Sequence, residues 1–238
     1  MAELTRVERD PPLLRLELTG GRLNVLTLDL VREMRQRFAE ASADGEIAAV
    51  ILAGGPSAFS AGLDMATLTQ SELAAQELLL EMGELLSEIY TSPRRVVASC
   101  AGHAVAAGAM LLLTADIRIG AKGEYRIGFS EVSMGLALPE LPVLLARDRL
   151  DPRRLQEATS LGRLWTPEEA VELGFLDRLV APDDLERAVL EAARGLAELD
   201  QEAYAGSIAS VRGATLQRMN ELLDAERKRL SALRSGSA

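Results

Sequence analysis

Two stretches of small residues, each placed directly after an apolar run of strand length, constrain the fold of this chain most. Residues 102–108 (GHAVAAG) follow the apolar run 95–100 and lead into an apolar helix that we expect to end near residue 114. Residues 59–64 (FSAGLD) follow the apolar run 48–53 in the same way. Apolar strands that alternate with helices in this manner are typical of an α/β fold.

Such turns also bring the backbone within reach of a ligand. Small side chains allow close approach, and the free N–H groups at the start of a helix attract an anion or a developing oxyanion. Two turns of this kind can direct two backbone N–H groups at one point, which forms an oxyanion hole without side chains. Taken alone, each turn is better explained as a tight strand-to-helix connection without chemistry.

The composition excludes several classes of function. The length of 238 residues favours one α/β domain with an appendage. A formal net charge of −10 argues against a general nucleic-acid or anionic-membrane binder. One cysteine and one histidine give neither an intrachain disulfide nor the usual ligands of a zinc site, so we expect no metal. No apolar run has membrane-spanning length and the first residues lack a signal-peptide core, so we expect a cytoplasmic protein.

The pattern along the chain is strand, strand, helix, repeated with irregular insertions. Strands are predicted at residues 4–8, 13–18, 48–53, 95–100, 117–120, 125–128 and 175–180. Helices are predicted at residues 27–43, 71–90, 139–147, 151–160 and 166–173. From residue 182 onward the pattern is helical, with a break at residues 206–213. The long helix at 71–90 carries an apolar stripe and a polar side that holds Glu77, Glu81, Glu84 and Glu88.

Four motifs in order resemble the enoyl-CoA hydratase/isomerase (crotonase) superfamily. They are residues 59–64, residues 102–108, residues 115–118 (ADIR), and residues 131–135 (EVSMG) followed by Pro139. The resemblance covers about residues 13–180. It implies a crotonase-like spiral of β/β/α units over residues 1–181 and a helical C-terminal region over residues 182–238. It also implies an acyl-CoA thioester as the ligand, no cofactor beyond the coenzyme A of that substrate, and a homotrimer or a dimer of trimers.

The resemblance assigns roles at the predicted site. The backbone N–H groups of Leu63 and Ala107 would hold the thioester oxygen and stabilise an enolate. The family often has glycine at the position of Ala107, and alanine keeps the N–H. Glu131 matches the second of two glutamates that hydratases of the family use. Met110 stands at the position of the first glutamate, and a thioether cannot act as an acid or a base.

A single carboxylate changes the expected reaction. One base can remove a proton at one carbon and return it at another, which favours double-bond isomerisation. Addition of water normally needs two groups to hold and activate it. The alternatives are an enoyl-CoA hydratase (a lyase) of the same family, a catalytically idle acyl-CoA binder, and a structural subunit. Glu131 taken alone is also explained as a solvated loop carboxylate.

Further residues are candidates for substrate binding: Arg22, Asn24, Ala61, Met65, His103, Met110, Pro139 and Glu140. Arg22 is the candidate for the coenzyme A phosphates. Glu140 would be a second carboxylate, although a role in the first turn of a helix is favoured. His103 would orient a substrate, although a histidine satisfied by backbone is favoured. The basic run 227–229 is predicted as a solvated helix face, with a neighbouring subunit's ligand as the alternative.

Overall fold

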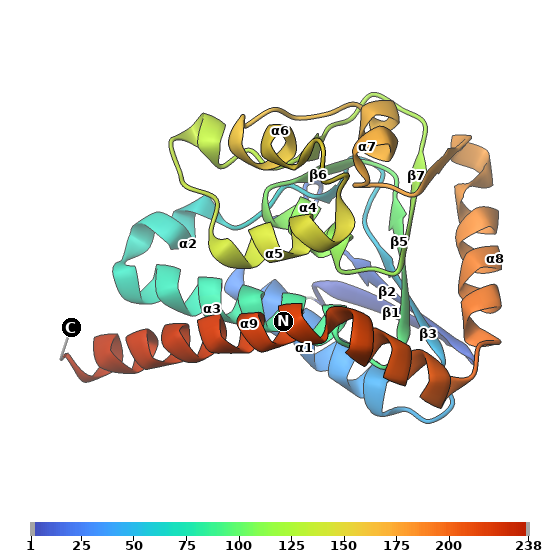
Figure 1. Ribbon diagram of the computed structural model, residues 1–238, viewed down its shortest axis with the longest axis horizontal. Helices are drawn as coiled ribbons and strands as arrows, with labels where there is room; N and C mark the ends of the chain where they lie inside the picture. Colours follow the sequence, from blue (N-terminus) through green and yellow to red (C-terminus); the bar gives the residue numbers. More distant parts are fainter. Residues whose placement is uncertain (1–2, 237–238) are drawn as a thin grey trace.

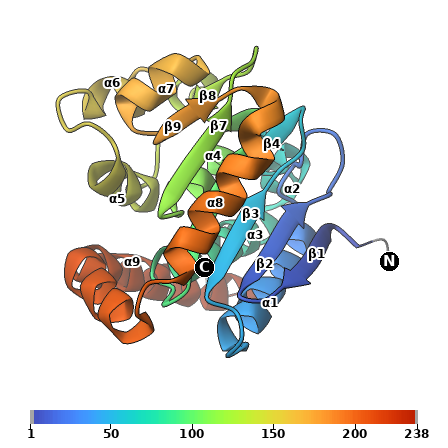
Figure 2. The same cartoon turned by 90° about the vertical axis from the view of Figure 1, so that its right-hand side faces the viewer.

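A six-stranded sheet forms the centre of the molecule. The computed structural model describes residues 3–236 (Figures 1 and 2). In the order in which they pair, the strands are β1 (Thr5–Asp10), β2 (Leu13–Leu18), β3 (Ala49–Ala53), β5 (Arg95–Cys100), β7 (Ile117–Ala121) and β9 (Arg178–Val180). β1 is antiparallel to β2, and every later neighbour pair is parallel. β3 and β5 are buried along their whole length, as strands covered on both faces should be.

A second, smaller sheet lies beyond the ends of these strands. It consists of three short parallel strands, β4 (Ala58–Ser60), β6 (His103–Val105) and β8 (Ile127–Gly128). The chain passes from a long strand into a short strand and then into a helix, three times. The helices of these repeats are α2 (Met65–Gln70) with α3 (Glu72–Tyr90), then α4 (Ala107–Leu113), then the 3₁₀ turn η1 (Val132–Met134) with α5 (Glu140–Arg149). The predicted spiral of β/β/α units is therefore confirmed.

Helices cover both faces of the large sheet. On one face, α1 (Leu28–Ala43), α3 and α4 contribute to the main apolar core. On the other face, α8 (Leu185–Ala197) lies across β3, β5 and β7 and buries Val189 and Ala193 against Ile51, Val97 and Ile119 (Figure 2). Two shorter helices, α6 (Leu155–Ser160) and α7 (Pro167–Leu173), lie beside α5 (Figure 1). The boundary between residues 181 and 182 stays a prediction.

Three predicted elements are shorter than expected. Of the strand predicted at residues 125–128, Ile127–Gly128 pairs in a sheet, and of the strand predicted at 175–180, Arg178–Val180 does. The helix predicted at 151–160 begins at Leu155, because residues 151–154 form a turn. Phe175 and Leu176 are apolar for another reason: they pack in the core, and the Leu176 N–H donates to Ala170 of α7. An apolar residue at the end of a predicted strand can therefore be buried in the core without pairing in a sheet.

The predicted break at residues 206–213 is wrong. The helix α9 (Gln201–Ser235) runs without interruption through Gly206 and Gly213. Each helical glycine costs about 1 kcal/mol relative to alanine, and side-chain contacts override that cost, since Arg212 between them is anchored in the protein interior. The short turn η2 (Pro182–Asp184) precedes α8. The break in the helical region lies between α8 and α9, where Asp200 caps the start of α9.

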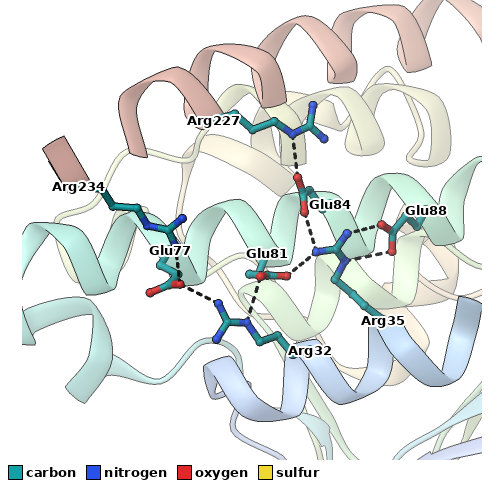
Figure 3. Close-up of polar contacts among 8 residues, drawn as sticks. All are labelled: Arg32, Arg35, Glu77, Glu81, Glu84, Glu88, Arg227 and Arg234. Atoms are coloured by element: carbon teal, nitrogen blue, oxygen red, sulfur yellow. Dashed lines mark hydrogen bonds and ion pairs between the residues drawn. The ribbon is translucent and has the colours of Figure 1, made fainter. Parts of the chain in front are cut away.

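Alternating charges join α1, α3 and α9. Figure 3 shows that the polar side of α3 lies between arginines of the other two helices. Arg32 of α1 donates to Glu77 at 2.7 Å and to Glu81 at 3.0 Å, and Arg227 of α9 donates to Glu84 at 2.9 Å. The full set, which we call the ion-pair ladder, is Arg32, Arg35, Glu77, Glu81, Glu84, Glu88, Arg227 and Arg234. In the basic run, Arg227 and Arg229 thus pair with glutamates of the same chain, the latter with Glu72.

Arg35→Met tests the ladder. Arg35 contacts Glu81, Glu84 and Glu88, and its side chain is 24% exposed. We expect the free energy of unfolding to fall by about 1–2 kcal/mol, because each partly exposed pair contributes roughly 0.2–1 kcal/mol. Urea unfolding at low and high salt measures the loss, which should shrink as salt screens the charges. Arg187→Met is the control, since Arg187 is exposed and pairs near its own helix. Equal losses in the two variants would contradict a role for the ladder.

Within residues 3–236, no helix combines the length and the apolar character that a membrane crossing requires.

Candidate active site

The first small-residue turn is held by a bridge to the segment before α1. The N–H of Leu26 donates to the carbonyl of Gly62 at 2.8 Å, and the N–H of Asp64 donates to the carbonyl of Leu26 at 3.1 Å. In a parallel bridge of this kind, the N–H of the residue between the two partners points to the opposite side. The backbone N–H of Leu63 therefore faces away from Leu26. Asp64 follows this turn and is the N-cap of α2, where its side chain accepts from the Thr67 N–H at 3.0 Å.

The second turn lies directly against the first. A Cβ atom on Gly108 would lie 2.2 Å from the carbonyl oxygen of Ser60, so only glycine fits there. A Cβ atom on Gly62 would lie 3.5 Å from the backbone nitrogen of Ala107. The two turns, far apart in the sequence, are thus in backbone contact. The small residues in both motifs are what this contact requires.

Ala106 introduces a strained backbone at the start of α4. Its φ is +53°, a left-handed conformation that residues other than glycine seldom adopt. Its N–H donates to Gly128 at 2.9 Å, and its carbonyl accepts from Met110 at 3.1 Å. Ala107 is then the first residue of the helix, where an N–H has no intrahelical acceptor. Among the hydrogen bonds of residues 3–236, none uses the N–H of Leu63 or of Ala107.

Glu131 is the carboxylate of the third repeat. It follows β8 and begins the 3₁₀ turn η1, and the N–H of Leu136 donates to its carbonyl at 2.9 Å. Its side-chain Oε2 is buried and accepts no hydrogen bond from any described residue. Burial raises the pKa of Glu131, and the N–H groups of Glu131 and Ser130 oppose this rise in part. A half-buried carboxyl with a raised pKa and an unused oxygen is suited to transfer protons.

Met110 lies in α4, and the sequence predicts that it replaces the first glutamate of the family's hydratases. Its side chain is buried among the apolar residues of the core, with 7% of the residue exposed. No proton can be carried by this thioether, so Glu131 is left without a second carboxylate from α4.

The comparisons with known proteins identify the family. The family model described as enoyl-CoA hydratase/isomerase matches residues 15–237. This chain belongs to the enoyl-CoA hydratase/isomerase family. A Mycobacterium tuberculosis protein named "Probable enoyl-CoA hydratase EchA17" is 31% identical over 222 residues, which cover 93% of this chain and 85% of that protein.

Two solved structures of the family have the same fold. An enoyl-CoA hydratase/isomerase family protein from Pseudomonas syringae superposes with a TM-score of 0.90 at 30% identity and covers 95% of this chain and 98% of its own. The human mitochondrial delta3-delta2-enoyl-CoA isomerase superposes with a TM-score of 0.91 at 25% identity and covers 97% of this chain and 92% of its own. The crotonase-like fold is therefore shown by structures of different origin.

One candidate binding residue of this family member, Asn24, supports the first turn. Asn24 is 1% exposed, has a φ of +45°, and donates from Nδ2 to the carbonyl of Ala58 at 3.1 Å. Ser60 donates from its hydroxyl to the Asn24 carbonyl at 2.8 Å and accepts from the Gly62 N–H at 3.2 Å. Asn24 thus holds the turn and turns its side chain away from solvent. Sequence reasoning missed Ser60, whose only signal was a serine in the small-residue motif.

The remaining candidates lie around these turns with different exposure. Arg22 and Met65 are exposed, Ala61 is half-buried, and Pro139 precedes α5 as its N-cap. His103 accepts at Nδ1 from the backbone N–H of Arg126 at 3.1 Å, so the backbone holds one of its ring nitrogens.

Glu140, the other candidate carboxylate, is engaged elsewhere. It begins α5, and Arg218 of α9 donates to both of its oxygens at 2.7 and 2.9 Å. The hydrogen bonds from Arg218 lower the pKa of Glu140, which keeps it ionised. This arrangement fits the first-turn role better than proton transfer. Within the described part of the chain, no three His, Cys, Asp or Glu side chains are grouped to hold a metal ion.

Proposed function

We propose that this family member moves the double bond of an enoyl-CoA thioester. The observation that carries the proposal is Glu131: its buried Oε2 has no partner among residues 3–236, while Met110 supplies no second carboxylate. The proposed site combines one proton-transferring group with two backbone N–H groups that no residue within 3–236 uses. One base and an oxyanion hole are sufficient for isomerisation.

The proposed chemistry follows from these groups. The N–H groups of Leu63 and Ala107 hold the thioester oxygen, where negative charge develops. Glu131 removes a proton from the carbon between the thioester carbonyl and the double bond of a 3-enoyl-CoA, which forms a conjugated enolate. The same carboxyl returns the proton to the far carbon of the original double bond and yields the 2-enoyl-CoA. Donors fixed by the backbone favour the enolate because they need no reorganisation during the reaction.

The pKa of Glu131 supports this role. A base works best when its pKa approaches the pH at which the enzyme operates. Burial raises the pKa of Glu131 in that direction. The name of the human structural relative, an enoyl-CoA isomerase, agrees with the proposal.

Hydration is the second candidate. The name of the mycobacterial relative favours it. Addition of water across the double bond needs a group that holds the water and a group that supplies the proton to carbon. Met110 can do neither, so we expect hydration to be slower than isomerisation.

We further propose the surroundings of the reaction. Coenzyme A binds with its phosphates near the exposed Arg22, the acyl part contacts Ala61, Met65, Met110 and Pro139, and the reaction needs no cofactor besides the coenzyme A of the substrate. The active form is a homotrimer or a dimer of trimers in the cytoplasm.

The experiment uses matched 3-enoyl-CoA and 2-enoyl-CoA substrates followed by absorbance of the conjugated thioester. We expect absorbance to rise with the 3-enoyl ester and to fall only slowly with the 2-enoyl ester. A fast fall with the 2-enoyl ester would identify a hydratase instead. A raised melting temperature with CoA esters and no turnover would identify an idle binder, and no thermal shift with any ester would overturn acyl-CoA binding.

A further inference from the structure

We infer that a groove beside Glu131 receives the distal end of the acyl chain and that Arg147 selects chains ending in a carboxylate. The inference rests on the proposed function, since it names the substrate class of the same site. It assigns to an exposed arginine a role in specificity.

The groove lies between η1, the segment before α5, α5 itself and α6. Its volume is about 450 Å³. Apolar side chains line part of it, among them Val132, Leu138 and Val143. Val132 is the residue directly after Glu131, so the groove begins next to the proposed base. Its apolar lining and its position suit the methylene groups of an acyl chain.

The same groove also carries polar and cationic side chains. Gln156 and Ser160 of α6 and Arg147 of α5 line it. An alkyl chain that ends in a methyl group makes no hydrogen bond with these groups. A chain that ends in a carboxylate would place its methylene groups against the apolar residues and its charge against Arg147, and Arg is suited to hold a carboxylate with two parallel N–H groups.

Arg147 is available for such a contact. Within residues 3–236 it has no carboxylate partner, in contrast to the nearby arginines Arg154 and Arg163, which both pair with Glu157. The charge of Arg147 helps to lower the pKa of Glu140, but both oxygens of Glu140 accept from Arg218 and not from Arg147. A position in the last turn of α5 suits a cation because of the helix dipole. The dipole does not explain why the guanidinium lines the groove.

The test compares ω-carboxyacyl-CoA esters with alkyl-CoA esters of equal chain length. Binding of the saturated esters is measured by calorimetry, and turnover of the 3-enoyl forms by absorbance. For the wild type we expect about tenfold tighter binding of the carboxylate-bearing ester at the best chain length, the effect of one charge-assisted hydrogen bond. Arg147→Met should abolish this preference and leave alkyl esters unaffected, and Arg147→Lys should restore part of it.

Arg153→Met is the matched control. Arg153 is an exposed arginine that pairs with Asp151 and does not line the groove, so its replacement removes the same charge without the proposed contact. The control variant should keep the preference.

Three results would overturn the inference. If alkyl esters bind and react but carboxylate-bearing esters gain nothing, the inference fails and the proposed function stands. If Arg147→Met weakens both kinds of ester equally and changes the oligomeric state in size-exclusion chromatography, the groove is a contact between copies of this chain. If no ester binds, the proposed function fails as well.

Discussion

Glu131→Gln is expected to lower kcat for 3-enoyl-CoA isomerisation by about 10²–10⁴-fold, the usual contribution of a general acid or base. The amide has nearly the same shape as the carboxyl but cannot carry the proton from one carbon to the other. KM should change little, because the backbone N–H groups and the coenzyme A contacts stay in place. Steady-state kinetics with one 3-enoyl-CoA measures both constants.

The pH dependence follows from the direction of the pKa shift. The base acts as a carboxylate, and burial raises its pKa above the ordinary 4.5. The rate of the wild type should therefore fall as pH decreases through that raised value, before an ordinary carboxyl is protonated. A pH profile of kcat/KM measures the effect.

The same shift predicts a gain in stability for the variant. In the unfolded chain the carboxyl of Glu131 ionises at its ordinary pKa, whereas in the folded protein ionisation is disfavoured. Its contribution to stability is full below the ordinary pKa and is lost as pH rises through the raised one. Glu131→Gln should thus have a higher melting temperature than the wild type at neutral pH, and the difference should shrink in acid.

Glu172→Gln serves as the control for both measurements. Glu172 is an exposed carboxylate of α7. It should leave activity and melting temperature unchanged. Full activity of Glu131→Gln would show that another group transfers the proton.

Arg212→Met is expected to lower the free energy of unfolding by about 3–5 kcal/mol, the range for removing one partner of a buried ion pair. Arg212 of α9 is 5% exposed, and its Nη2 donates to Asp116 at 2.7 Å. Its Nη1 donates to the carbonyl of Tyr90 at 2.5 Å, and the guanidinium lies 4.3 Å from the centre of the Tyr90 ring. Methionine fills much of the space but removes the guanidinium partner of the Asp116 carboxylate, which still accepts from the Val96 N–H. Denaturant unfolding measures the loss.

Two further variants separate the charge from the packing. Adding Asp116→Asn to Arg212→Met should recover part of the stability, because the double variant has no uncompensated buried charge. Arg218→Met on the same helix removes an exposed arginine that pairs with Glu140, and its effect should be much smaller. A loss with Arg212→Met no larger than with Arg218→Met would show that the buried pair does not hold α9 on the molecule.

The long helices agree with the sequence-based prediction better than the short strands do. The helices α1 and α3 lie where their apolar spacing predicted them, and the first residue of each predicted range, Thr27 and Ser71, is the N-cap. The short strands β4 and β6 lie where the sequence predicts turns. Three residues are too few for a period to be recognised, and their pairing partners lie in other repeats.

The candidate site shows the same division. The order of the motifs predicts Leu63, Ala107 and Glu131 as site residues, and Met110 predicts that the first glutamate is missing. The left-handed backbone of Ala106 was invisible, since alanine carries no local signal for such a conformation. Its carbonyl accepts from the first turn of α4, while its N–H donates to Gly128, a residue distant in the sequence.

By itself the sequence determined the family, the order of the longer strands and helices, and the residue types of the candidate site. Those properties depend on local spacing and on residue identity, which the chain carries with it. Only the tertiary structure decided the partners of each polar face. Glu77, Glu81, Glu84 and Glu88 have the spacing of a solvated helix side, yet they lie between α1 and α9 in Figure 3. The charges on a helix determine which side chains it can pair with. The packing of helices distant in the sequence determines whether those charges are solvated or form ion pairs with arginine.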